Sequence, residues 1–202
     1  MNCVGICGKI SLNDIFASVD TIQVGVIFMK HFLIVVDIQN DFVNGALGTK
    51  EAEGIIANAC EKIKAFEGEI FVTYDTHFED YLTSAEGAKL PVEHCIKGTD
   101  GWQLNGEIQN ALSGKNYTAV EKLTFGSVEL PELIKKAAGD SDFDITLIGL
   151  CTDICVVSNA LILKANFYDK DIIVDKNCCA GVTVDSHNAA LTTMQMCQIE
   201  IV

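Results

Sequence analysis

The chain has 202 residues, of which 49 % are hydrophobic, and its formal net charge is −14. This length suits one sizeable α/β domain, and the acidic balance argues against nucleic acid and anionic membrane surfaces as partners. The 9 cysteines are irregularly spaced, which indicates reduced thiols in a cytoplasmic protein rather than a disulfide framework. No apolar run reaches the roughly 18 residues of a membrane-spanning helix.

The first 28 residues carry no periodic pattern. Asp14 and Asp20 interrupt their apolar stretch, which argues against a signal peptide. Met29 begins a segment that resembles a natural start. We therefore expect an N-terminal extension at residues 1–28, outside the native fold, and one folded domain at residues 29–202.

Strand-like and helix-like segments alternate along the rest of the chain. Phe32 to Val36 is a continuous apolar run, as expected for a strand buried on both faces of a parallel sheet. The pattern predicts strands at residues 32–36, 70–73, 117–121, 144–150, 171–174 and 198–202, helices at 51–66, 102–112, 129–138, 155–164 and 186–196, and loops at 78–101 and 178–181. The alternation favours an α/β fold with a parallel sheet covered by helices.

The most informative segment is a strand that turns into a helix at residues 145–164. Cys155 falls in the expected first turn of that helix, where unpaired N–H groups and partial positive charge lower a thiol pKa. The same position supplies backbone donors for an oxyanion. The alternative is an inert core cysteine, because most cysteines in apolar segments are small core residues. A dithiol of Cys151 and Cys155 is a third interpretation, although the usual Cys-x-x-Cys spacing is absent.

Two further strands end in residues that carry chemistry. Asp37 directly follows the first buried strand, and Lys122 follows the third. Ligands of open α/β sheets bind outside the carboxyl ends of the strands, so we interpret Asp37 as a functional residue. Asp41 is interpreted as a turn or capping residue, and Lys122 on its own could equally be a surface charge.

A candidate metal site follows the second strand and continues into the long loop. Asp75, His77 and His94 offer one carboxylate oxygen and two imidazole nitrogens, and Glu86 is a candidate fourth ligand. This donor set suits Zn, Fe or Mn. The competing interpretation is that each histidine is a hydrogen-bonded structural group.

Three motifs together resemble the signature segments of the isochorismatase-like cysteine hydrolases. They are Val36-Asp37-Ile38-Gln39-Asn40-Asp41-Phe42, Glu121-Lys122 and Thr152-Asp153-Ile154-Cys155. Their order and spacing match over residues 29–202. The resemblance implies a Rossmann-like three-layer sandwich, in which helices flank a six-stranded parallel sheet.

The resemblance also implies roles for individual residues. Cys155, Asp37 and Lys122 would form a catalytic triad, and a cis peptide before Cys151 would point the backbone N–H groups of Cys151 and Cys155 into the site as oxyanion donors. Within the superfamily the chain is most similar to nicotinamidases, which bind a metal through Asp-x-His and a later His.

Asp75, His77 and His94 match that metal pattern. Many nicotinamidases have another His where this chain has Thr83, and Glu86 is the candidate that replaces it. The implied cofactor is a divalent metal ion, with Zn first and Fe or Mn as alternatives. Phe42 and Phe125 are candidates to pack against the substrate ring, and each could equally belong to the core.

The resulting hypothesis is hydrolysis of a small-molecule amide through a thioester, with nicotinamide as the leading substrate. The alternatives are another amidase of the family that acts on a carbamoyl or ureido substrate, and a non-catalytic member. Isochorismatase itself is disfavoured because it needs neither Cys155 nor the metal ligands. The sequence leaves the oligomeric state open, with a homo-oligomer as one option.

Overall fold

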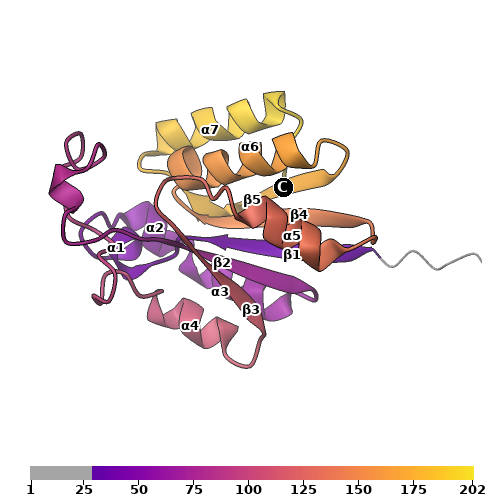
Figure 1. Ribbon diagram of the computed structural model, residues 1–202, viewed down its shortest axis with the longest axis horizontal. Helices are drawn as coiled ribbons and strands as arrows, with labels where there is room; N and C mark the ends of the chain where they lie inside the picture. The colour runs from indigo at the N-terminus through magenta and orange to yellow at the C-terminus, as the bar shows by residue number, and fades with distance from the viewer. Residues whose placement is uncertain (1–28) are drawn as a thin grey trace, which may run out of the picture.

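The computed structural model describes residues 29–202, which form a six-stranded parallel sheet with helices on both faces (Figure 1). The strand order is β3-β2-β1-β4-β5-β6, and every neighbouring pair is parallel. The strands are β1 (Lys30–Val36), β2 (Glu69–Asp75), β3 (Tyr117–Lys122), β4 (Phe143–Leu150), β5 (Asp171–Ala180) and β6 (Glu200–Ile201). The expected Rossmann-like three-layer α/β sandwich is confirmed.

The helices divide into two groups, one on each face of the sheet (Figure 1). One core contains the buried side chains of α1 (Asn40–Val43), α2 (Lys50–Gly54), α3 (Ile56–Ala65) and α4 (Gly106–Leu112). The other contains those of α5 (Leu130–Ala138), α6 (Val157–Asn166) and α7 (Val184–Met196). Each helix therefore buries one apolar side against the sheet.

Burial of the central strand β1 on both faces explains its apolar sequence. Leu33 and Val35 belong to the core under α3 and α4, whereas Phe32, Ile34 and Val36 belong to the core under α5 and α6. All five are fully buried. A strand with two buried faces has no solvent side to mark with polar residues, which is why the run is continuously apolar.

Two predicted helices are shorter or more divided than expected. The helix predicted at residues 51–66 is two helices, because the chain leaves the regular helix at Ile55, directly after the poor helix former Gly54. The helix predicted from residue 102 begins at Gly106, where the Asn105 side chain caps it by accepting the N–H of Glu107.

The prediction of a loop at residues 178–181 is wrong for residues 178–180, which belong to a strand. β5 continues through Cys178 and Cys179 to Ala180, after a register shift against β4 between Leu147 and Gly149. The strand resumes pairing beyond this irregularity, with Cys179 opposite Gly149. A shifted register hides a strand from sequence analysis because the alternation of buried residues is interrupted.

Gly149 lets β4 lie unusually close to β1. Its φ is +123°, and a Cβ at this position would lie 2.1 Å from the Val36 carbonyl oxygen. Only glycine tolerates both conditions. The close approach lies one residue before the carboxyl end of β4, so it helps to fix the distance between the ends of the two central strands.

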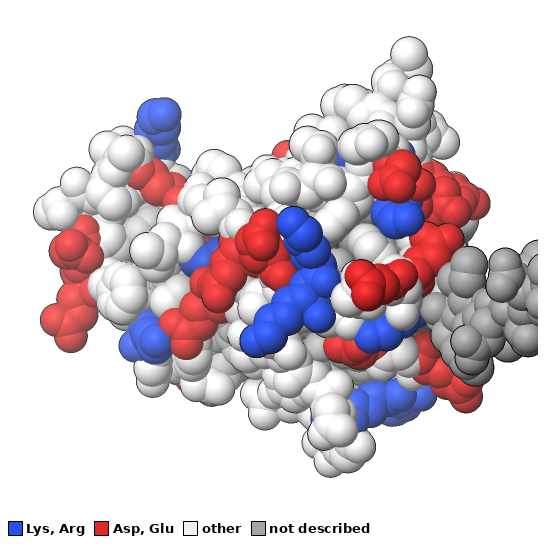
Figure 2. Space-filling view, turned by 45° about the vertical axis from the view of Figure 1, so that its right-hand side comes forward, with Lys and Arg blue, Asp and Glu red and all other residues white. Residues whose placement is uncertain are grey.

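The strands β1 and β2 run toward the end of the molecule that carries α1, α2 and the long loop with the short 3-10 helix η2 (Tyr81–Thr83) (Figure 1). On the face shown in Figure 2, basic side chains lie among acidic ones rather than in one continuous patch. None of the helices in residues 29–202 has the length and apolar character that crossing a membrane requires. The proposed extension at residues 1–28 lies outside the described part of the chain.

Candidate active site

The sheet register brings the predicted polar residues together. Asp75 and Lys122 are directly paired at the ends of β2 and β3, and Asp37 follows Val36 at the end of β1. The π-helical turn η3 (Thr152–Val156), which carries Cys155, begins two residues after β4 ends. Because parallel strands end at one edge of the sheet, four adjacent strands supply this cluster.

Lys122 occupies the centre of the cluster. Its ammonium nitrogen lies 2.7 Å from Asp37 Oδ2, 3.1 Å from Asp75 Oδ1 and 3.6 Å from Cys155 Sγ. The side chains of Lys122 and Asp37 are 1 % and 0 % exposed. Burial disfavours the charged lysine, but the charges of Asp37 and Asp75 outweigh burial and raise the pKa of Lys122. The lysine is therefore a fixed cation between two carboxylates and a thiol.

Asp37 has one oxygen engaged and one available. Thr73 donates its hydroxyl to Asp37 Oδ1 at 2.6 Å. Oδ2 faces the Lys122 ammonium but accepts no hydrogen bond of regular geometry from residues 29–202. Burial raises the pKa of Asp37, while the charge of Lys122 opposes that rise. The available oxygen therefore belongs to a carboxylate that is a better proton acceptor than an exposed one.

The expectation of a low thiol pKa at Cys155 is wrong. Cys155 is 4 % exposed, and burial together with the charge of Asp37 raises the pKa of its thiol well above the ordinary value, against the opposing effect of Lys122. The helix also begins with a π-helical turn instead of regular α-helix. Loss of hydration outweighs the attraction of a helix terminus here, because a buried thiolate loses its water completely.

The cis peptide implied by the family resemblance is present between Leu150 and Cys151. Cys151 is partly exposed, and Cys151, Ile154 and Cys155 line the same cavity. Burial raises the pKa of the Cys151 thiol to about 12. Both cysteines of the predicted oxyanion site therefore lie at the cavity wall.

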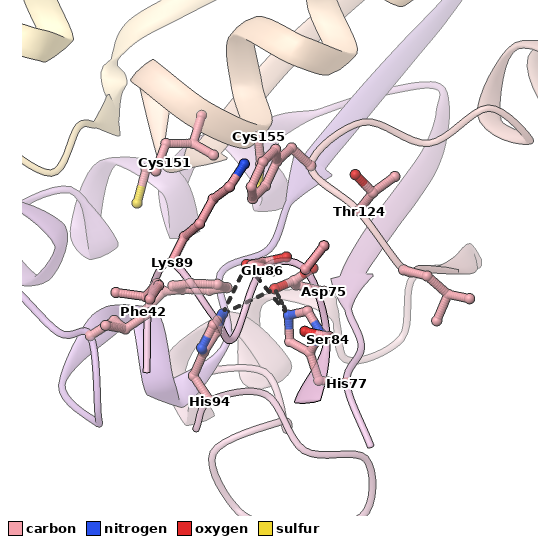
Figure 3. A pocket seen from close by; sticks show the side chains of 16 residues that line it. Phe42, Asp75, His77, Ser84, Glu86, Lys89, His94, Thr124, Cys151 and Cys155 are labelled. Atoms are coloured by element: carbon pink, nitrogen blue, oxygen red, sulfur yellow. Dashed lines mark hydrogen bonds and ion pairs between the residues drawn. The ribbon is translucent and has the colours of Figure 1, made fainter. Parts of the chain in front are cut away.

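The three predicted metal ligands form a buried cluster. One donor atom from each of Asp75, His77 and His94 lies within 4.8 Å of the others. Asp75 Oδ2 is 3.1 Å from His77 Nε2 and 3.6 Å from His94 Nε2. Glu86 Oε1 lies 3.8 Å from both imidazole Nε2 atoms, so the loop also delivers the fourth candidate (Figure 3).

The hydrogen bond on the far side of His94 indicates what this cluster holds. His94 Nδ1 lies 2.8 Å from the Val92 carbonyl oxygen, which can only accept, so Nδ1 carries a proton. In the neutral imidazole, Nε2 is then a bare acceptor that faces oxygens of Asp75 and Glu86. These facing atoms need either a second proton on the imidazole, a form that the raised pKa of His94 beside Asp75 favours, or a cation between them. The set of two imidazoles and carboxylates fits a divalent metal ion.

Asp75 joins the two clusters. Its Oδ1 accepts from Lys122 and its Oδ2 faces the histidines. Burial favours the neutral acid, but hydrogen bonds with His77 and His94 and the charge of Lys122 outweigh it and lower the pKa of Asp75. One carboxylate thus serves the triad residues and the metal ligands at the same time.

A cavity of about 530 Å³ is lined by both cysteines and by all four candidate metal ligands, whereas the buried Asp37 and Lys122 are not among its lining residues. Its volume lies in the range of small-molecule sites. Figure 3 shows His77 and His94 at one end and the two cysteines toward the other. Phe42 and Phe125 both line the cavity. Phe42 is buried with its ring 5.6 Å from that of His94, and Phe125 is 42 % exposed.

Several residues that support the site were not predicted from the sequence. Gln39 clamps the backbone of Asp75, since Oε1 accepts the Asp75 N–H at 2.8 Å and Nε2 donates to the Asp75 carbonyl at 2.9 Å. Buried Asn159 donates to the carbonyl oxygens of Cys155 and Phe125. Gln39 stands inside the first motif and could have been singled out there. Asn159 offers no signal in the sequence.

Lys89 was also missed, although it lines the cavity. Its side chain extends from the long loop toward the end where the cysteines lie (Figure 3). The residue is exposed, and an exposed lysine in a polar loop is not distinguishable in a sequence from any other surface charge.

The fold and the polar strand ends define an α/β enzyme whose site lies at the carboxyl edge of a parallel sheet. The chain belongs to the isochorismatase family, because the profile described as "Isochorismatase domain" matches residues 31–202. It is therefore a hydrolase of this family.

Individual relatives support the same assignment. The chain is 30 % identical to a Bacillus subtilis protein described as "Uncharacterized isochorismatase family protein PncA", over 81 % of this chain and 93 % of that protein. A crystal structure of nicotinamidase/pyrazinamidase PncA from Bacillus subtilis is 27 % identical, with a TM-score of 0.73, and covers 86 % of this chain and 100 % of its own. The pyrazinamidase of Pyrococcus horikoshii in complex with zinc shares the fold at 23 % identity and a TM-score of 0.71, over 86 % of this chain and 98 % of its own.

Proposed function

We propose that this chain is a cysteine-dependent nicotinamidase that converts nicotinamide and water into nicotinate and ammonia. The observation that carries the proposal is that Cys155 and the cluster of Asp75, His77 and His94 line the same cavity. Cys155 would be the nucleophile, and the metal ligands would select an aromatic amide. The similarity to nicotinamidase/pyrazinamidase proteins supports this choice of substrate.

The first half-reaction begins with a proton transfer. Asp37 accepts the thiol proton of Cys155, and the thiolate sulfur attacks the carbonyl carbon of the amide. This transfer moves a negative charge from Asp37 to Cys155, and Lys122 lies within 3.6 Å of both. The net charge of the buried cluster stays constant, so a thiol with a raised pKa can still react.

The tetrahedral intermediate carries its charge on the former carbonyl oxygen. Backbone N–H groups of Cys151 and Cys155 are the proposed donors to that oxygen. Collapse of the intermediate breaks the C–N bond, and Asp37 returns its proton to the leaving ammonia. Asp37 then takes a proton from water, which attacks the thioester, and nicotinate leaves while Cys155 regains its proton.

Asp75, His77 and His94, with Glu86 as a fourth candidate, would hold the divalent cation, for which Zn is our first choice and Fe or Mn are alternatives. When bound, the cation supplies an electrophilic contact for the pyridine nitrogen. Phe42 and Phe125 would pack against the ring from the cavity wall. All cysteines among residues 29–202 are free thiols, which suits a reducing cytoplasmic setting.

The test is ammonia release from nicotinamide by the purified protein under reducing, metal-replete conditions. We expect turnover with nicotinamide and much slower turnover with an N-carbamoyl amino acid offered as the competing substrate class. Absence of turnover with nicotinamide, together with turnover of the carbamoyl substrate, would replace the nicotinamidase assignment by the other amidase of the family.

A further inference from the structure

Asp41 lies in the short helix α1 and connects it to the loop that carries His94. Its Oδ2 accepts the backbone N–H of Cys95 at 2.8 Å, and its Oδ1 accepts that of Ala46 at 3.2 Å. The backbone N–H of Asp41 donates to the Gly101 carbonyl at 3.0 Å. This carboxylate therefore fixes the loop at the residue next to a metal ligand, which is more than the capping role expected from the sequence.

The peptide groups of Cys95 connect the two histidines. Cys95 follows His94 in the chain, and its carbonyl accepts the backbone N–H of His77 at 3.0 Å. Cys95 also has a φ of +47°, a conformation that residues other than glycine rarely adopt. Such a conformation persists where its surroundings hold it, and the Asp41 carboxylate is the partner of its N–H.

We propose that Asp41 is a positioning residue that sets the affinity of the site for its divalent cation. It acts through Cys95, whose fixed backbone determines how His94 and His77 stand relative to each other. The inference rests on the proposed metal site. The inference gives Asp41 a role different from that of Asp37, the proposed proton acceptor, although the two carboxylates lie four residues apart on one segment.

Gly101 provides an independent way to disturb the same carboxylate. A Cβ added to Gly101 would lie 2.1 Å from Asp41 Oδ2 and 2.4 Å from its Cγ. An alanine there must displace the carboxylate without removing it. Gly106, in the same part of the chain, is the matched control, because an added Cβ there meets no atom within 4 Å.

The experiment is titration of metal-free protein with Co²⁺, followed by its visible absorption. Residues that orient metal ligands typically change affinity by about 10- to 100-fold, so Asp41→Ala should weaken Co²⁺ binding by that factor. Gly101→Ala should weaken binding in the same direction. Asn40→Ala removes a hydrogen bond from Asn40 to the Asp100 carbonyl of the same loop, and it should bind Co²⁺ like the parent, as should Gly106→Ala.

Two further readouts distinguish positioning from a general loss of structure. Asp41→Asn keeps one oxygen for the Cys95 N–H and should restore most of the affinity that Asp41→Ala loses. Alkylation of Cys155 in the metal-free protein, located by peptide mass spectrometry, should proceed at the same rate in Asp41→Asn as in the parent. If Asp41→Ala does not fold, Asp41→Asn and Gly101→Ala carry the comparison.

Parent-like Co²⁺ affinity in Asp41→Ala or Gly101→Ala, or equal weakening in Asn40→Ala, would overturn the inference. A parent protein that binds no Co²⁺ overturns it together with the metal site. Nicotinamide turnover by the parent is measured separately, so failure of the positioning role and failure of the proposed function give different results.

Discussion

The two ends of the cavity are built in different ways. At the thiol end, Asp37 and Lys122 sit at strand ends, and Cys155 lies in the turn that follows β4. At the metal end, only Asp75 belongs to a strand, while His77, Glu86 and His94 come from the loop after β2. Sheet register fixes the distances between the polar residues at the thiol end. At the metal end, hydrogen bonds from α1 hold the loop that carries His94. We therefore expect bond-breaking chemistry at the first end and substrate orientation at the second.

The largest expected effect is at the thiol end. Cys155→Ala removes the nucleophile, and turnover should fall to background, a loss of at least about 10⁴-fold. Cys151→Ala is the matched control, because its proposed role belongs to the backbone N–H, and its rate should stay within about tenfold, roughly 1.4 kcal/mol of barrier. Steady-state rates decide between them. An active Cys155→Ala beside an inactive Cys151→Ala would mean that the nucleophile is misassigned.

Lys122 should affect both activity and stability. Lys122→Met leaves the buried carboxylates of Asp37 and Asp75 without their shared cation, and breaking a buried ion pair costs about 3–5 kcal/mol. We expect that loss in the free energy of unfolding, together with severe loss of turnover. Lys97→Met is the control, since Lys97 pairs with Glu121 on the surface. Urea unfolding that shows equal stability in both variants would contradict the central position of Lys122.

These two predictions depend on features that the sequence revealed well. Apolar runs that end in Asp37, Asp75 and Lys122 are visible without a structure, and parallel strands must place their ends together. Electrostatics was less predictable. The position of Cys155 after a strand indicated a low thiol pKa. The residue is instead buried in a core that it shares with β1, β3 and α6, and no local pattern brings these segments together.

The metal end was predictable only in part. Asp75, His77 and His94 were found by residue type and spacing, but their fixation by Gln39 and Asp41 depends on hydrogen bonds between segments about 36 to 54 residues apart. The irregular pairing that extends β5 past Cys179 has the same origin. Long-range pairing of this kind leaves no periodic trace in the sequence.

A smaller effect should separate the two ends kinetically. His94→Ala should raise the Michaelis constant for nicotinamide by about tenfold or more and lower kcat by less, because it removes binding more than chemistry. His31→Ala is the control, since His31 lies near the opposite end of β1 and pairs with Asp144. A loss confined to kcat would show that the metal end takes part in bond breaking. Removal of the cation with a chelator should reproduce the result for His94→Ala.

The smallest effect concerns stability at mildly acidic pH. Burial lowers the pKa of His187 below its ordinary value of 6.5, against the opposing charge of Asp153. The unfolded chain then binds more protons, so the stabilising contribution is present above pH 6.5 and is lost as the pH falls through the folded-state pKa. His187→Gln should weaken this pH dependence. Melting temperatures of both proteins between about pH 7.5 and pH 5 check this, because that range spans the ordinary histidine pKa, and identical slopes would contradict it.

The most direct test of the account is to trap the thioester. Protein mixed with nicotinamide and quenched in acid should carry one nicotinoyl group, and peptide mass spectrometry should locate it on Cys155. The adduct should disappear in Cys155→Ala and persist in Cys151→Ala. Formation of nicotinate without any adduct by a protein in which Cys155→Ala remains active would contradict the covalent mechanism.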